Sequence, residues 1–151
     1  MKGWLAILAL FGATMQAQSL ELLDTRQAAT LLQGEAPRVI ALWSLDCAYC
    51  EANLRKLDAL ATERKVELVV VATDSPERRV EVEARLEALK LTHRSTWIYA
   101  EDTPERLNYR IDPQWGGELP RTLLLPSGEA VSGALTEKQL AKWREKLTPR
   151  S

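Results

Sequence analysis

The stretch RVIALWSLDCAYC, residues 38–50, decides which fold and chemistry are expected of this chain of 151 residues. Its first seven residues form an apolar run of the kind found in strands that are buried on both faces. The pattern then becomes helical, because Cys50, Leu54 and Leu57 are spaced by four and three positions and fall on one helix face. Cys47 and Cys50, the only cysteines, are therefore expected where a buried strand ends and a helix begins.

The spacing of the two cysteines suits three kinds of site: half of a zinc site, a structural disulfide or a redox pair. A structural zinc ion needs about four ligands, but the chain has no second cysteine pair, and its single histidine, His93, lies in another loop. A disulfide that closes so short a ring constrains the unfolded chain little. The redox pair is the strongest of the three readings, and spacing alone leaves the other two open.

The expected position of the pair favours redox chemistry. The N-terminus of a helix presents unpaired N–H groups and the positive end of the helix dipole. Both favour a thiolate at Cys47, the reactive form, and lower the pKa of its thiol. Cys50 lies one turn further along and faces the core. We therefore expect Cys47 to attack a substrate disulfide and Cys50 to resolve the resulting mixed disulfide.

The rest of the chain alternates between strand and helix patterns. Alternating elements of this kind predict an α/β fold, with a mostly parallel sheet flanked by helices on both faces. The last two strands are joined by a short PSGE turn and must be antiparallel, so the sheet is expected to be mixed. Strands are expected at 20–23, 38–44, 66–73, 95–100, 122–125 and 130–131, and helices at 26–32, from 47, from 76, at 104–109 and from 136.

Composition and the first residues bear on location. The chain is 46% hydrophobic and 27% charged with a net charge of −1, which is ordinary for a globular domain and shows no basic patch of the nucleic-acid type. Lys2, an apolar run of about ten residues and then small and polar residues form the layout of a secretory signal. We expect a signal peptide at 1–19, cleaved after Ala17 or Ser19, and one domain at 20–151. The mature chain is then exported, to the periplasm in a Gram-negative cell, where disulfides persist.

A second motif, GGELPRT, ends at the start of the predicted strand 122–125. A proline at the entry to a strand either marks an edge strand or belongs to a cis peptide bond. Together with RVIALWSLDCAYC, this motif resembles the thioredoxin-fold superfamily, and the likeness extends over about Leu20 to Leu147. The resemblance implies a cis bond at Leu119–Pro120.

The resemblance also implies an active site. Trp43, Cys47, Cys50 and Pro120 match the aromatic residue, the two cysteines and the cis-proline of thioredoxins. The main chain of Leu119 is then expected to pair with the substrate backbone. No metal or separate cofactor is implied, because the redox-active disulfide itself carries the electrons.

The spacing between the two motifs points to a branch of that superfamily. Cys47 and Pro120 are 73 positions apart, which leaves room for an inserted helix and strand, plausibly within 74–100, relative to plain thioredoxin. This layout is similar to the exported TlpA/ResA-like proteins. Members of that branch are mostly reductants, which implies envelope protein thiols and disulfides as substrates and a membrane thiol carrier as electron donor. A monomer that binds no nucleic acid is expected.

Three departures leave the direction of electron flow open. Asp46 stands where the branch has Trp, and its carboxylate is expected to disfavour the Cys47 thiolate and make the pair more reducing. Ala41 replaces the buried acid that thioredoxin carries six positions before its first cysteine. Tyr49, between the cysteines, resembles glutaredoxins and exported isomerases, which indicates the opposite direction and a role in contacting substrate.

Other functions remain as alternatives. The chain could be an isomerase or oxidase of the same fold, or a non-catalytic binding module whose thiolates handle Cu(I). A peroxidase is weaker, because Ser44 stands where a threonine would be expected three positions before Cys47. The segment Trp115–Gly117, just before Leu119, is either a flexible rim that touches substrate or a loop held by an aromatic plug.

Overall fold

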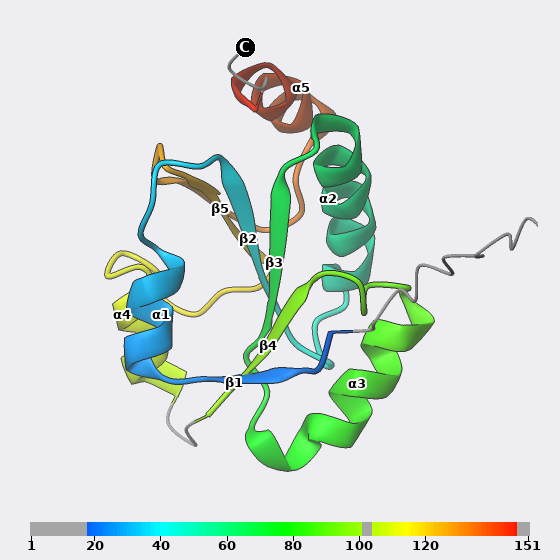
Figure 1. Ribbon diagram of the computed structural model, residues 1–151, viewed down its shortest axis with the longest axis vertical. Helices are drawn as coiled ribbons and strands as arrows, with labels where there is room; N and C mark the ends of the chain where they lie inside the picture. The colour runs from blue at the N-terminus through cyan, green and yellow to red at the C-terminus, as the bar shows by residue number, and fades with distance from the viewer. Residues whose placement is uncertain (1–17, 101–103, 148–151) are drawn as a thin grey trace, which may run out of the picture.

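The computed structural model describes residues 18–100 and 104–147, and the predicted signal peptide therefore lies almost wholly outside the described residues. The chain alternates between strands and helices as the sequence predicts (Figure 1). The elements are β1 (Glu21–Leu23), α1 (Thr25–Leu31), β2 (Arg38–Trp43), α2 (Cys50–Arg64), β3 (Glu67–Ala72), η1 (Pro76–Arg78), α3 (Arg79–Ala88), β4 (Ser95–Tyr99), α4 (Pro104–Ile111), β5 (Arg121–Leu125), β6 (Glu129–Ser132) and α5 (Glu137–Lys146).

The strands form one six-stranded mixed sheet in the order β1-β4-β3-β2-β5-β6. The four strands β1, β4, β3 and β2 are mutually parallel, whereas β5 runs antiparallel to β2 and β6 antiparallel to β5. The predicted mixed, mostly parallel sheet is confirmed. The β4 strand lies between β1 and β3, and the segment 74–100 expected to hold extra elements contains η1, α3 and β4.

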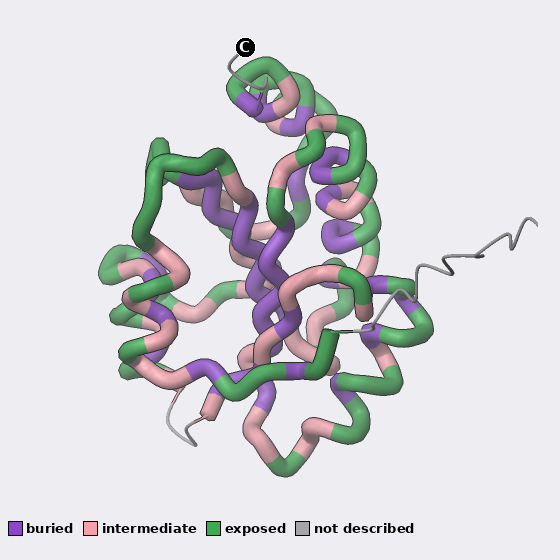
Figure 2. The backbone as a smooth tube through the Cα atoms, in the orientation of Figure 1, coloured by how far each residue is buried: buried purple, intermediate pink, exposed green. Residues whose placement is uncertain are grey.

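Helices cover both faces of the sheet and divide the core into two clusters. On one face, α2 and α3 lie together, and on the other α1 lies beside α4 (Figure 1). The first cluster joins residues of α2, α3 and α5 to alternate residues of the strands and contains Cys50 and Trp143. The second joins α1 and α4 to the opposite face of the same strands and contains Tyr99 and Trp115. Buried residues accordingly line the central strands and the inner sides of the helices, and exposed ones lie outside (Figure 2).

Local sequence explains how several helices begin. At α1 the Asp24 carboxylate accepts the Gln27 N–H while the Gln27 side chain accepts the Asp24 N–H, which together form a capping box. At α5, which the sequence predicts to begin from 136, Thr136 and Gln139 form a capping box of the same kind. Before α3, Pro76 begins a short 3₁₀ turn, where its missing N–H leaves no bond unmade.

The helix after the cysteines begins later than the sequence pattern suggests. It starts at Cys50, with Tyr49 as the N-cap, so Cys47 lies in the turn that precedes it. The Cys47 N–H donates to the Ser44 carbonyl, and the Cys50 N–H donates to the Cys47 carbonyl, each at 3.3 Å. Apolar periodicity reports which residues face the core and not which carbonyls accept helical hydrogen bonds, and this is why it misplaced the boundary.

Within the described ranges 18–100 and 104–147, none of the helices combines the length and the apolar character that crossing a bilayer requires.

Candidate active site

The cysteine motif and the GGELPRT motif meet at one end of the central strands of the sheet. The parallel strands β2 and β3 end there, and the antiparallel strand β5 begins there. Leu42 pairs with Arg121 in the β2–β5 register, so the next position along places Pro120 level with Trp43. The cysteine turn and the Leu119–Pro120 segment are therefore brought together by strand pairing, although 73 positions separate Cys47 from Pro120 in sequence.

Cys47 and Cys50 form a disulfide, with 5.4 Å between their Cα atoms. Their environments differ: Cys47 is half-buried, whereas Cys50, the first residue of α2, is 0% exposed and belongs to the first core cluster. Cys47 is therefore the more exposed of the two cysteines. The sequence predicts this division between an accessible and a shielded cysteine.

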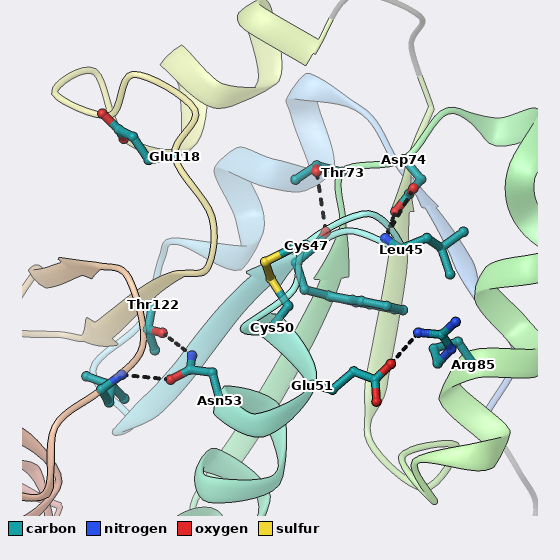
Figure 3. The surroundings of a disulfide bond; sticks show 12 residues. Leu45, Cys47, Cys50, Glu51, Asn53, Thr73, Asp74, Arg85, Glu118 and Thr122 are labelled. Carbon is teal, nitrogen blue, oxygen red and sulfur yellow. Dashed lines mark hydrogen bonds and ion pairs between the residues drawn. A yellow bond between two sulfur atoms is a disulfide. The ribbon is translucent and has the colours of Figure 1, made fainter.

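The backbone before the cysteines is held by residues at the end of β3 (Figure 3). The Thr73 N–H donates to the Trp43 carbonyl at 2.9 Å. The carboxylate of Asp74 accepts the Leu45 N–H at 3.1 Å. Burial raises the pKa of Asp74, and this effect exceeds the opposing effects of the Leu45 hydrogen bond and the nearby Arg78 charge. Asp74 thus fixes the main chain two residues before Cys47.

The Leu119–Pro120 peptide bond is cis, and so is Leu125–Pro126 at the other end of β5, which the sequence analysis did not anticipate. Trp115 anchors the loop that precedes Pro120. Its indole is 6% exposed, and its Nε1–H donates to the Glu118 carbonyl at 2.8 Å. Of the two readings of the Trp115–Gly117 segment, the aromatic plug is confirmed for Trp115. Leu119 is partly buried and packs against both core clusters.

Comparisons with known proteins show which solved structures share this architecture. No family model matches the sequence, and no curated protein matches it either. Solved structures do match. A secreted Mycobacterium tuberculosis disulfide oxidoreductase homologous to E. coli DsbE is 18% identical, with a TM-score of 0.56 over 78% of this chain and 85% of that one. The chain has a thioredoxin fold.

Two further structures extend the comparison of this thioredoxin-fold chain. A thiol:disulfide interchange protein of the thioredoxin family from Chlorobium tepidum is 16% identical, with a TM-score of 0.57 over 79% of this chain and 83% of that one. A thio-disulfide isomerase from Thermus thermophilus is 23% identical, with a TM-score of 0.51 over 74% and 78%. The predicted fold class is confirmed.

The other residues predicted for the site differ in how far they are exposed to solvent. Tyr49 is 70% exposed between the two cysteines and is available to a partner. Trp43 is 1% exposed, and its Nε1–H has no hydrogen-bond partner among the described residues. The expected place of Trp43 in the active site stays a prediction: in this structure strand β2 ends beneath the cysteine turn, and the indole packs in the first core cluster. Ala41 is likewise buried, and it supplies no acid.

Asp46 is not a free carboxylate. Its side chain is 80% exposed, but Oδ2 lies 2.6 Å from Nη1 of Arg78. Glu51, in the first turn of α2, pairs with Arg85 of α3 (Figure 3). Each acidic residue that the sequence places beside the cysteines therefore has a basic partner on η1 or α3, which sequence spacing does not reveal.

Asn53 is a site residue that the sequence analysis missed. It lies one turn after Cys50 on α2 and is 1% exposed. Its Nδ2 donates to Thr122 Oγ1 at 3.1 Å, and its Oδ1 accepts the Leu135 N–H at 3.0 Å (Figure 3). Asn53 thereby connects the cysteine helix to β5, two residues after Pro120. The available signal was a polar residue next to the apolar face defined by Cys50, Leu54 and Leu57.

Proposed function

We propose that this chain is a thiol–disulfide oxidoreductase. The observation that carries the proposal is the disulfide between a half-buried Cys47 and a fully buried Cys50, at the end of the sheet where Leu119 and Pro120 lead into β5. The names of the matched structures, which include disulfide oxidoreductases and an isomerase, support the same chemistry.

The proposed reaction begins from the dithiol. The Cys47 thiolate attacks one sulfur of a substrate disulfide, forms a mixed disulfide and releases the other substrate sulfur as a thiolate, which takes up a proton. The Cys50 thiolate then attacks the Cys47 sulfur and releases the second substrate thiol. The substrate gains two electrons and two protons, and the protein is left with the Cys47–Cys50 disulfide.

Substrate contacts are assigned to the surface around Cys47. Leu119, just before the cis bond, is proposed to pair through its main chain with the substrate backbone, while Pro120 sets the direction of that segment. The Pro120 carbonyl already accepts the Gly133 N–H at 2.8 Å, so it is held within the protein. Tyr49, which is 70% exposed, supplies an aromatic surface that a substrate chain can cover.

We propose reduction as the direction, with envelope protein disulfides as substrates and a membrane dithiol carrier restoring the reduced state. The likeness of the motif spacing to the mostly reducing TlpA/ResA-like proteins supports it, because 73 positions separate Cys47 from Pro120 in this chain. Export is supported by the signal-like first residues and by the secreted M. tuberculosis match. The exposed Tyr49 and the isomerase match favour the second direction, disulfide formation or shuffling.

The reduction potential of the Cys47–Cys50 pair decides between these directions. Equilibration with glutathione or dithiothreitol should give a value near or below about −270 mV if the chain is a reductant. A value of about −120 to −180 mV, the range of strong oxidants and isomerases, would contradict the reductive assignment.

Cysteine replacements test the activity itself. Cys47→Ser and Cys50→Ser both remove the disulfide, so each controls for the structural effect of losing it. We expect Cys47→Ser to abolish reduction of insulin disulfides in the presence of dithiothreitol. Cys50→Ser should instead accumulate mixed disulfides through Cys47, detectable by non-reducing electrophoresis and mass spectrometry. Full activity of the Cys47→Ser variant would remove the proposal.

A further inference from the structure

Arg78 connects three parts of the chain beside the cysteine turn. Its guanidinium lies 2.6 Å from Asp46 in the turn, 3.1 Å from Asp74 after β3, and 3.2 Å from Glu81 on α3. Hydrogen bonds to Glu81 and Asp46 raise the pKa of Arg78, so its positive charge is permanent at any working pH. Asp46 is the residue immediately before Cys47.

Two features distinguish this arrangement from an ordinary surface ion pair. Exposed pairs usually contribute little, because two long side chains must be ordered in a mobile, solvated geometry. Here the Asp74 carboxylate is 2% exposed and also accepts the Leu45 N–H at 3.1 Å. Arg78 is therefore held by a buried anchor that is itself bonded to the backbone of the cysteine turn. Little additional ordering is needed for Arg78 to hold Asp46.

The position of the Asp46 carboxylate matters for Cys47. A carboxylate near a thiol disfavours the thiolate, since two negative charges then lie close together. An unpaired Asp46, 80% exposed and adjacent in sequence, would be free to sample positions beside the Cys47 sulfur. Pairing with Arg78 confines that carboxylate to the η1 side and offsets its charge.

We infer that Arg78 is a positioning residue for the redox pair: it holds the Asp46 carboxylate against η1 and so keeps the reduced Cys47 accessible as a thiolate. This inference rests on the proposed function, because it assigns Cys47 as the attacking sulfur. It also refines the interpretation of Asp46, whose effect on Cys47 becomes conditional on Arg78.

Other charges around the turn belong to the same electrostatic environment. The Glu51–Arg85 pair on α2 and α3 brings one charge of each sign, so it changes the local net charge little. The elements around the turn also contribute the exposed Glu118 of the loop before β5, Glu77 of η1, and the paired Arg79 and Glu83 of α3.

The test measures the pKa of the Cys47 thiol in full-length Cys50→Ser protein, where Cys47 is the only thiol. The rate of alkylation by iodoacetamide is followed as a function of pH. We expect Arg78→Gln to raise that pKa by roughly one unit, which means about tenfold less thiolate at a pH below it. Asp46→Asn should lower the pKa. In the Asp46→Asn background, Arg78→Gln should raise it by less than half as much, because only the direct charge effect then remains.

Two further variants control the test. Arg79→Gln removes the neighbouring arginine, which pairs with Glu83 at 2.9 Å, and should leave the thiol pKa unchanged. Arg78→Lys keeps the charge and should stay close to the parent protein. An equal Arg78→Gln shift with Asp46 and with Asn at position 46, or no shift at all, would overturn the inference. Alkylation needs no protein substrate, so failure here is distinct from failure of the Cys47 activity test.

Discussion

The two faces of the sheet contribute differently to the candidate active site. The cysteine face, defined by α2, α3 and α5, carries Cys50 and Asn53. The opposite face, defined by α1 and α4, has no cysteine, but its core holds Trp115, which anchors the loop before Pro120. Leu119 packs against both cores.

This difference shows that the site is a junction between two cores. The cysteine face contributes Cys50 and the start of α2, and Asn53 connects that helix to β5. The opposite face positions the segment proposed to receive substrate. A site built in this way should be sensitive to residues on both faces, but in different measurable respects.

The largest expected effect comes from the opposite face. Trp115→Ala should destabilise the protein by about 3–5 kcal/mol, because it removes a large buried side chain and leaves a cavity. It should also weaken substrate binding, since the Glu118 carbonyl loses its indole partner. Urea unfolding and insulin-reduction kinetics would measure the two effects. Trp115→Phe retains much of the volume and should recover most of the stability. If both variants keep the parent KM at temperatures where they are folded, the opposite face does not support the site.

A smaller effect is expected on the cysteine face. Asn53→Ala should cost about 1–3 kcal/mol, because the buried Leu135 N–H and Thr122 hydroxyl lose their partner. It should also lower the rate of disulfide exchange, since α2 is no longer tied to β5. Asn108→Ala is a matched control on the opposite face, where Asn108 accepts the Tyr99 hydroxyl at 2.7 Å. We expect similar stability loss but little change in exchange rate for the control. Equal rate losses in both variants would indicate a general stability effect.

The smallest effect concerns the attachment of α5, away from the cysteines. Glu129 on β6 accepts hydrogen bonds from Lys146, Trp143 and Lys142, which lower its pKa to about 2. A depressed pKa means that the carboxylate contributes stability above pH 4.5, and that this contribution is lost as the pH falls towards 2. Glu129→Gln should cost about 1 kcal/mol at pH 7 and nothing near pH 2, measured by thermal unfolding across pH. Any loss of exchange activity in this variant would show that α5 influences the site.

Much of the fold could be predicted from the sequence because buried strands and amphipathic helices carry local signals. The apolar run after Arg38 and the alternation of strand and helix patterns identified the mixed sheet. The two capping boxes depend on residues three apart, so both helix starts could be inferred locally.

The site was predicted less completely. The burial of Trp43 could not be predicted, because an aromatic residue before a turn gives the same local pattern whether its ring points outward or into the core.

By itself, the sequence determined the cysteine pair, the order of the elements and the difference in burial between Cys47 and Cys50. Each of these depends on residues within a few positions of one another. Tertiary structure alone decided which charges and amides surround the sulfurs. Arg78 meets Asp46 across 32 positions, and Asn53 meets Thr122 across 69. Such contacts follow from strand register and from helix placement on the sheet, which no local pattern encodes, and they set the charges and hydrogen bonds around the cysteine turn.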